Sequence, residues 1–150
     1  MSEYRATIEW STAATAEDFR KGRYSREHNW TFDGGVRVSA SSSPSVVPAP
    51  WSNPANVDPE EAYVAAIASC HMLTLLYIAA KAGFVMTSYR DAAVGVMTKT
   101  APQWVERVTL APQITGGDEV PTAAELAHLH HLAHEGCFIA NSVKTEIVVT

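Results

Sequence analysis

The chain has few cysteines, and none of them form a close pair. Its 150 residues include only Cys70 and Cys137, and no CxxC motif is present. A small secreted scaffold held by disulfides, or a zinc ribbon, needs more cysteines at closer spacing. Two distant cysteines leave three interpretations: inert core residues, one structural disulfide, or a reactive pair.

Positive charge is also scarce. Eleven Lys and Arg stand against sixteen Asp and Glu, which gives a net charge of -5. The chain lacks the basic surplus that holds a phosphate backbone, so we expect no nucleic-acid partner. Small or thiol-linked substrates fit this composition better. Because 47% of the residues are hydrophobic, we expect a core and a single domain over residues 1–150.

A targeting signal is missing from the first residues, MSEYRATIEW, which contain acids and alternating polarity. We therefore expect a cytoplasmic protein. The stretch 62–82 is nearly uncharged and long enough to span a bilayer. Alanine dominates it and polar residues such as Ser69 and His71 interrupt it, so we expect a helix buried in protein and no membrane partner.

The first half of the chain predicts strands followed by one long helix. Residues 4–10 alternate in polarity, and residues 28–40 carry Asp33-Gly34-Gly35 between alternating segments, which indicates a hairpin. A proline- and serine-rich loop at 41–57 has no charged residue. Asp58-Pro59-Glu60-Glu61 then marks a helix start, and we expect that helix to run to Ala82, before Gly83.

The second half predicts two strands, a helix and a last strand. We expect strands at 84–99 and 103–113, closed by turn residues at 115–118. Thr122 and Glu125 have the spacing of a capping box for the second helix, and residues 142–150 return to a strand pattern. The predicted fold class is α+β.

Two motifs, taken together, resemble the OsmC/Ohr family of thiol peroxidases. The first is the helix start at 58–61 with an alanine-rich helix that leads to Cys70, and the second is Gly136-Cys137 followed by Asn141-Ser142. The resemblance implies an OsmC-like fold, with antiparallel sheets, two central helices and an intertwined homodimer. It also implies reduction of organic hydroperoxides, with Cys70 as the attacking thiol and Cys137 as the resolving thiol. No cofactor is implied beyond an external dithiol reductant such as a lipoyl-type thiol.

The family also uses an arginine near the attacking sulfur and a glutamate that holds this arginine. Glu60 matches the motif glutamate, but ten helical residues rise about 15 Å, so it cannot touch Cys70 of its own helix. If Glu60 acts at the site, it contacts an arginine that reaches across or serves the site of the partner subunit. The loop at 41–57 has no arginine. We favour Arg26 for this role, with Arg23 second, among the arginines near the first hairpin. His71 beside Cys70 and Phe138 after Cys137 depart from the usual pattern and indicate a divergent subgroup.

Four histidines in the second predicted helix suggest a rival class. His130 and His134 lie four residues apart on one helical face, and Cys137 follows at a spacing that allows a third metal ligand. Alternatively, His134 is a neighbour of the Cys137 thiol. His71 is a weak candidate for the base of Cys70, because adjacent helical residues point about 100° apart. A redox sensor or a metal- or ligand-binding module on the same fold remains the alternative to an enzyme.

Overall fold

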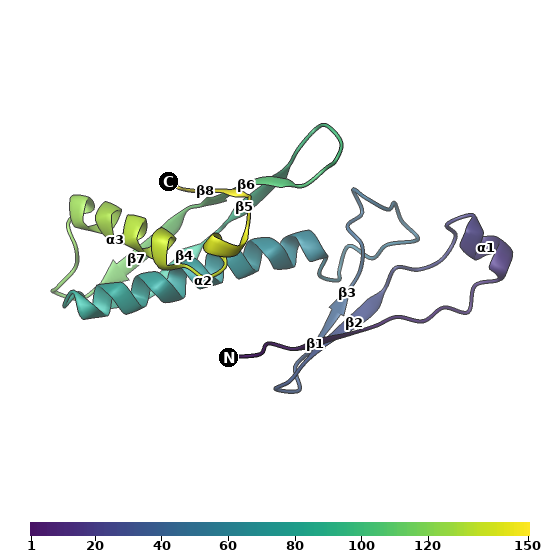
Figure 1. Ribbon diagram of the computed structural model, residues 1–150, viewed down its shortest axis with the longest axis horizontal. Coiled ribbons are helices and arrows are strands. Elements are labelled where there is room, and N and C mark those ends of the chain that lie inside the picture. Colours follow the sequence, from purple (N-terminus) through teal and green to yellow (C-terminus); the bar gives the residue numbers. More distant parts are fainter. The chain divides into compact units, whose positions relative to one another are not determined.

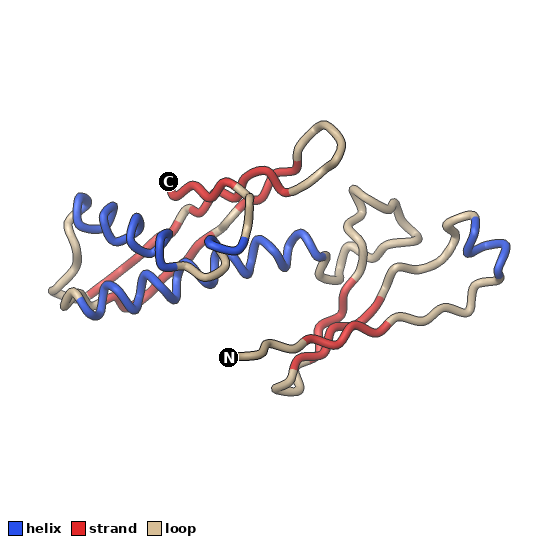
Figure 2. The backbone as a smooth tube through the Cα atoms, viewed as in Figure 1, coloured by secondary structure: helices blue, strands red, loops and turns tan.

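The computed structural model describes all 150 residues and has mixed α and β structure (Figure 1). The chain divides into two compact units, Met1–Ala62 and Tyr63–Thr150. The predicted α+β class is confirmed. Helices and strands are separated by colour in Figure 2.

The first unit contains a three-stranded antiparallel sheet in the order β1-β2-β3. Its strands are β1 (Ala6–Glu9), β2 (His28–Phe32) and β3 (Arg37–Ala40). The predicted hairpin joins β2 to β3, and Gly35 adopts a φ of 88°, a conformation that glycine reaches without strain. The end of β3 is joined to the segment just before the long helix, since the Ser41 N–H donates to the carbonyl of Val57, two residues before that helix, at 3.0 Å.

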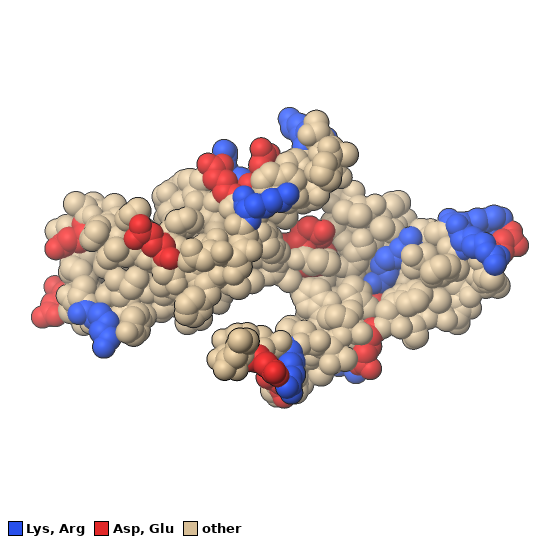
Figure 3. Space-filling view, in the orientation of Figure 1, with Lys and Arg blue, Asp and Glu red and all other residues tan.

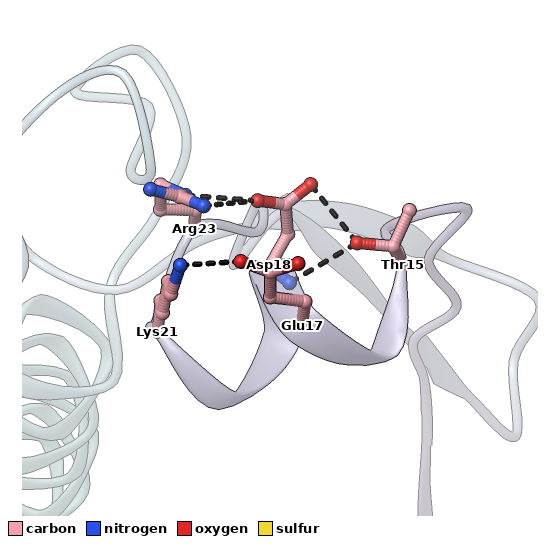
Figure 4. A network of polar contacts seen from close by, with 5 residues as sticks. All are labelled: Thr15, Glu17, Asp18, Lys21 and Arg23. Atoms are coloured by element: carbon pink, nitrogen blue, oxygen red, sulfur yellow. Dashed lines mark hydrogen bonds and ion pairs between the residues drawn. The ribbon is translucent and has the colours of Figure 1, made fainter.

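A short helix, α1 (Ala16–Arg20), lies between β1 and β2 and was missed by the sequence analysis. Thr15 caps it by accepting a hydrogen bond from the Asp18 N–H. Figure 4 shows how Asp18 also pairs with Arg23, while Glu17 pairs with Lys21. Hydrogen bonding to Arg23 and then to Thr15 lowers the pKa of the Asp18 carboxyl. Capping and local ion pairs thus hold a helix too short to show a hydrophobic period.

The long helix, α2 (Pro59–Lys81), begins and ends as its sequence predicts. Asp58 accepts a hydrogen bond from the Glu61 N–H at 2.8 Å, and the Glu61 carboxylate accepts one from the Asp58 N–H at 3.1 Å. This reciprocal pair satisfies two backbone donors at the helix start. Gly83, with a φ of 89°, follows the last turn.

Two small sheets belong to the second unit. One pairs β4 (Met86–Asp91) with β7 (Pro112–Gly116), and the other has the order β5-β6-β8, with β5 (Val94–Met97), β6 (Val105–Leu110) and β8 (Glu146–Val149). β6 and β8 are parallel, whereas the other pairs are antiparallel.

The prediction of one continuous strand at 84–99 and one at 103–113 was wrong. Each segment is split between the two sheets, and Thr115 and Gly116 extend β7 in place of forming a turn. The Asp91 carboxylate accepts a hydrogen bond from the Ala111 N–H at 2.8 Å, which joins the two breaks. Where both segments pass from one sheet to the other, a hydrogen bond to a side chain therefore takes the place of backbone pairing between strands.

The second helix, α3 (Ala123–Gly136), starts with the predicted capping box of Thr122 and Glu125. A short 3-10 turn, η1 (Ala140–Ser142), precedes β8. Two apolar clusters form the core of this unit. One joins Leu75 and Ala79 of α2 to Leu129 and Ala133 of α3, and the other joins Ile67 of α2 to Val108 and Leu110 of β6.

α2 is long and apolar enough to cross a membrane, but it also supplies residues to both apolar clusters of the core. Its charged residues lie at the two ends, Glu60 and Glu61 in the first turn and Lys81 in the last. On the face in Figure 3, charged side chains form small separate groups with broad uncharged areas between them. Only 22% of the most apolar window of α2 is buried, so much apolar surface is left uncovered.

The end of β7 provides a test of this packing. A Cβ at Gly116 would lie 2.4 Å from the Val85 carbonyl oxygen, whereas a Cβ at Gly117 would meet nothing within 4 Å. We expect Gly116→Ala to lower the free energy of unfolding by about 1–3 kcal/mol, because backbone must shift to accept the methyl group. Gly117→Ala, measured beside it by urea unfolding, should change stability by less than about 0.5 kcal/mol. Equal stabilities of the two variants would contradict this account of the sheet end.

Candidate active site

The two cysteines, far apart in sequence, are neighbours in the second unit. Cys70 lies in the middle of α2 and is partly exposed, whereas Cys137 caps the end of α3 and is only 1% exposed. Both are free thiols. The Cys70 thiol lies near enough to Cys137 to raise the pKa of the Cys137 thiol. The two thiols are therefore neighbours, as both a disulfide and a reactive pair require.

Gly136 allows the end of α3 to approach α2 beside Cys70. A Cβ at Gly136 would lie 3.3 Å from Cγ2 of Thr74, which is tighter than ordinary contact. Thr74 lies one turn beyond Cys70 and donates its hydroxyl to the Cys70 carbonyl at 2.9 Å. The glycine before the second cysteine thus has a packing role in bringing the two thiols together.

The segment after Cys137 folds back on this cysteine. The Ala140 N–H donates to the Cys137 Sγ at 3.4 Å, and the Asn141 side-chain amide donates to the carbonyls of Glu135 and Cys137 at 2.8 and 3.0 Å. Asn141 therefore closes the end of α3, where helix carbonyls lack partners. This accounts for the asparagine of the sequence motif as a structural residue that fixes the second thiol.

The two thiols differ in their electrostatic environment. Burial raises the pKa of the Cys137 thiol, and the neighbouring Cys70 raises it further, while the Ala140 N–H acts in the opposite direction. A buried thiol without a nearby cation remains protonated at neutral pH. Cys137 is thus held as the protonated partner, beside a more accessible Cys70.

The predicted arginine and glutamate lie together in the first unit. Arg26 and Glu60 line one pocket of about 430 Å³. Its apolar wall includes Trp10, Phe19 and Tyr24, whose rings pack on one another, with Phe19 and Tyr24 stacked at 4.5 Å between centroids. Sequence reasoning missed this aromatic wall, because Phe19 reaches it from the unpredicted helix α1.

Arg26 is held in the pocket by its own neighbours. Its guanidinium lies 3.6 Å from the centre of the Tyr24 ring and donates to the Gly22 carbonyl at 2.7 Å. Arg23, the second choice, instead pairs with Asp18 at 2.7 Å (Figure 4). Arg26 therefore shares a cavity with Glu60, whereas Arg23 is engaged by α1.

Glu60 has a buried oxygen without a partner. Its Oε2 is inaccessible to solvent and makes no hydrogen bond. Leaving a buried polar atom unpaired costs about 1–3 kcal/mol. Such a cost beside an arginine in a pocket is typical of a functional site.

The rival metal arrangement is not formed. His130 bonds to His71 across the α2–α3 interface, with 2.9 Å between His71 Nε2 and His130 Nδ1. The ring of His134 is exposed, and its contact with Cys137 is through the backbone, from the Cys137 N–H to the His134 carbonyl. No three His, Cys, Asp or Glu side chains converge to hold a metal ion. His71 faces α3, so it is not positioned as a base for Cys70.

The fold and the facing thiols define an α+β protein with a cysteine pair between two helices, and comparison with known proteins gives its family. The model of OsmC-like proteins matches residues 52–150. The chain therefore belongs to the OsmC/Ohr family. The comparison with curated proteins found no match.

Solved structures of this family match the whole chain. An OsmC-like protein of unknown function from Vibrio cholerae is 51% identical, covers 100% of this chain and 99% of its own, and has a TM-score of 0.93. An organic hydroperoxide resistance protein OsmC from Legionella pneumophila is 15% identical, with 100% and 95% coverage and a TM-score of 0.72. The organic hydroperoxide resistance protein OhrB of Bacillus subtilis is 17% identical, with 99% and 96% coverage and a TM-score of 0.67. The latter two likenesses show the fold alone.

The buried histidine predicts how stability depends on pH. Burial, and then the charges of His130 and His134, lower the pKa of His71 from 6.5 to about 4. When the pH falls below 6.5, the unfolded chain binds this proton before the folded chain does, so stability is lost between pH 6.5 and 4. We expect the free energy of unfolding to be about 2 kcal/mol lower at pH 5 than at pH 7 through this group.

Urea unfolding at the two pH values checks this expectation. His71→Gln removes the titrating ring and should reduce the loss between pH 7 and pH 5. His128→Gln, at an exposed position of α3, should keep the wild-type loss. An undiminished loss in His71→Gln would show that other groups cause it.

Proposed function

We propose that this protein is a thiol-dependent peroxidase that acts in the cytoplasm and reduces organic hydroperoxides. The observation that carries the proposal is the asymmetry of the facing thiols. Cys70 is accessible, while Cys137 is buried and its raised pKa keeps it protonated. An accessible thiol can meet a peroxide, and a protonated neighbour can hydrogen-bond to its thiolate.

The proposed reaction needs no cofactor. The Cys70 thiolate attacks the distal oxygen of the hydroperoxide, the O–O bond breaks, and the alkoxide leaves and takes a proton to become an alcohol. The Cys70 sulfenic acid then condenses with the Cys137 thiol to form a disulfide, with loss of water. A dithiol such as a lipoyl-type thiol reduces the disulfide by thiol exchange and is itself oxidised.

In the proposed homodimer, Arg26 and Glu60 of one subunit supply the electrostatic part of the site at the partner's Cys70, since Glu60 cannot reach Cys70 of its own helix. A guanidinium near a thiol favours the thiolate and stabilises negative charge on the departing oxygen. Glu60, with its unpartnered buried oxygen, has an acceptor available to hold that guanidinium. The aromatic wall of the same pocket favours an organic over an inorganic peroxide.

The proposal includes a homodimer, and the surface of α2 supports it. Leu73 and Tyr77 lie four residues apart on α2 and are 60% and 66% exposed. Small residues such as Ala66 and Ser69 are also exposed on this helix and permit close approach. A helix that is apolar on several sides but buried on one needs a second apolar surface. A second copy of the chain meets that requirement.

Replacing each thiol separately tests the proposed roles. We expect Cys70→Ser to lower consumption of an alkyl hydroperoxide by more than about 100-fold, because the nucleophile is lost. Cys137→Ser should keep the first oxidation but fail to form a disulfide. Stopped-flow oxidation with an alkyl hydroperoxide and with hydrogen peroxide, followed by mass spectrometry of the protein, separates these effects.

Two outcomes would count against the enzyme. Wild-type consumption by Cys70→Ser would refute the attacking role of this thiol. A single oxidation of the wild-type protein, without multiple turnovers in the presence of a dithiol, would instead favour the redox sensor.

A matched pair of arginine variants tests the activating group. We expect Arg26→Met to slow oxidation of Cys70 by about 100-fold, because it removes the positive charge that stabilises the departing oxygen. Arg23→Met should react within about twofold of wild type, since Arg23 pairs with Asp18. The measurement is the rate of Cys70 oxidation as a function of pH. A larger effect at Arg23 would reverse the assignment.

A further inference from the structure

A buried imidazole ring and a partly buried one join α2 to α3 close to the thiol pair. His71 of α2 is 1% exposed, and its Nε2 lies 2.9 Å from Nδ1 of the partly buried His130 of α3. The ring planes differ by 7° and the ring centres are 5.2 Å apart. A separation of 2.9 Å between the nitrogens and one of 5.2 Å between the ring centres are compatible only if both nitrogens lie on the line between the ring centres. The rings therefore meet edge to edge in a nearly straight hydrogen bond.

Such a bond requires one donor and one acceptor nitrogen, so the two rings share one proton at this contact. Both rings are uncharged at neutral pH, since burial lowers the pKa of each, although Asp91 opposes this effect at His130. A neutral buried bond of this kind costs little when formed and much when one partner is removed. It fixes the separation of the two helices where it forms.

The position of this bond relates it to the two sulfurs. His71 is the residue after Cys70, and His130 precedes Cys137 by seven residues, which is about two turns along the same side of α3. Each helix therefore contributes one member to the histidine pair and one member to the thiol pair. The apolar contacts of Leu75 with the α3 cluster are less directional than a hydrogen bond and do not define a separation as closely.

We propose that the His71–His130 hydrogen bond is a positioning device that sets how readily Cys70 and Cys137 close into a disulfide. In the proposed peroxidase, it speeds condensation of the Cys70 sulfenic acid with the Cys137 thiol, and so limits further oxidation to the sulfinic acid. This consequence rests on the proposed function. The effect on the dithiol and disulfide equilibrium does not.

The equilibrium is therefore measured first, without peroxide. The purified full chain is oxidised with diamide, which takes two electrons and two protons from the thiols, and is then equilibrated in dithiothreitol buffers. We expect His130→Ala to lower the effective concentration of the thiol pair about fivefold. His130→Asn places an amide near the position of Nδ1 and should return it to within twofold of wild type. His128→Ala, exposed on the same helix, should match wild type.

The second measurement uses an alkyl hydroperoxide in excess. In His130→Ala, we expect the rate of Cys70 oxidation to stay within twofold of wild type, while the fraction of Cys70 sulfinic acid per turnover rises several-fold. A general loss of structure would lower the rate of Cys70 oxidation as well as the rate of disulfide closure. Rescue by His130→Asn argues against such a loss. Should His130→Ala fail to fold, His71→Met removes the bond while it fills the buried space.

Closure at the wild-type equilibrium and rate in both His130→Ala and His71→Met would overturn the inference. So would a wild-type protein in which diamide forms no Cys70–Cys137 disulfide. A wild-type protein that forms the disulfide but consumes no peroxide would refute the proposed peroxidase. In that case, a fivefold weaker disulfide in His130→Ala would still support the positioning role.

Discussion

The packing of one side of α2 is the constraint on which the second unit depends. Ile67, His71, Leu75 and Ala79 recur every four residues, and each is at most 1% exposed. This spacing places them on one face of the helix. Burial of each large apolar member contributes about 1.5–3 kcal/mol. The same stripe fixes the direction of Cys70, which lies at its edge, partly exposed and beside the end of α3. The site geometry thus follows from helix packing more than from contacts made by the cysteine.

A histidine in the centre of this stripe lowers the stability of the fold unless its ring nitrogens are hydrogen-bonded. His130 provides the partner for one nitrogen. An apolar residue would fill the same space without a partner, but it would leave the α2–α3 separation to side-chain packing alone. Next to the pair, Tyr89 and Asp91 each retain one buried oxygen without a hydrogen bond. Burial, and then Asp91, raise the pKa of Tyr89 to about 12, so its hydroxyl stays protonated. Burial lowers the local dielectric, which strengthens the hydrogen bonds that form there.

Local signals in the sequence predicted much of this architecture. Capping residues at Asp58 and Thr122 marked both long helices, and a glycine turn marked the first hairpin, because each signal acts within a few residues. The change of sheet at Asp91 could not be predicted, since it depends on Ala111, twenty residues away. Helix α1 carried a capping pattern in Thr15 and Asp18, which could have identified it. The pairing of His130 with His71 was hidden because sequence spacing compares residues on one helix, and the partner lies on another.

The two predicted pairs of site residues differ in whether their buried polar groups are hydrogen-bonded. The thiol pair is compact and satisfied: Cys137 is buried, accepts a backbone hydrogen bond and remains protonated. The pocket of Arg26 is unsatisfied, because Glu60 keeps a buried oxygen that bonds to nothing. A buried carboxylate oxygen lowers stability until a donor reaches it. Arg26 already donates to backbone carbonyls of its own loop. If the Arg26 guanidinium exchanged one of these carbonyls for the Glu60 carboxylate, it would gain a charge-assisted hydrogen bond. Such a rearrangement would lower the free energy of the pocket, whereas the thiol pair has no unpaired buried atom to satisfy.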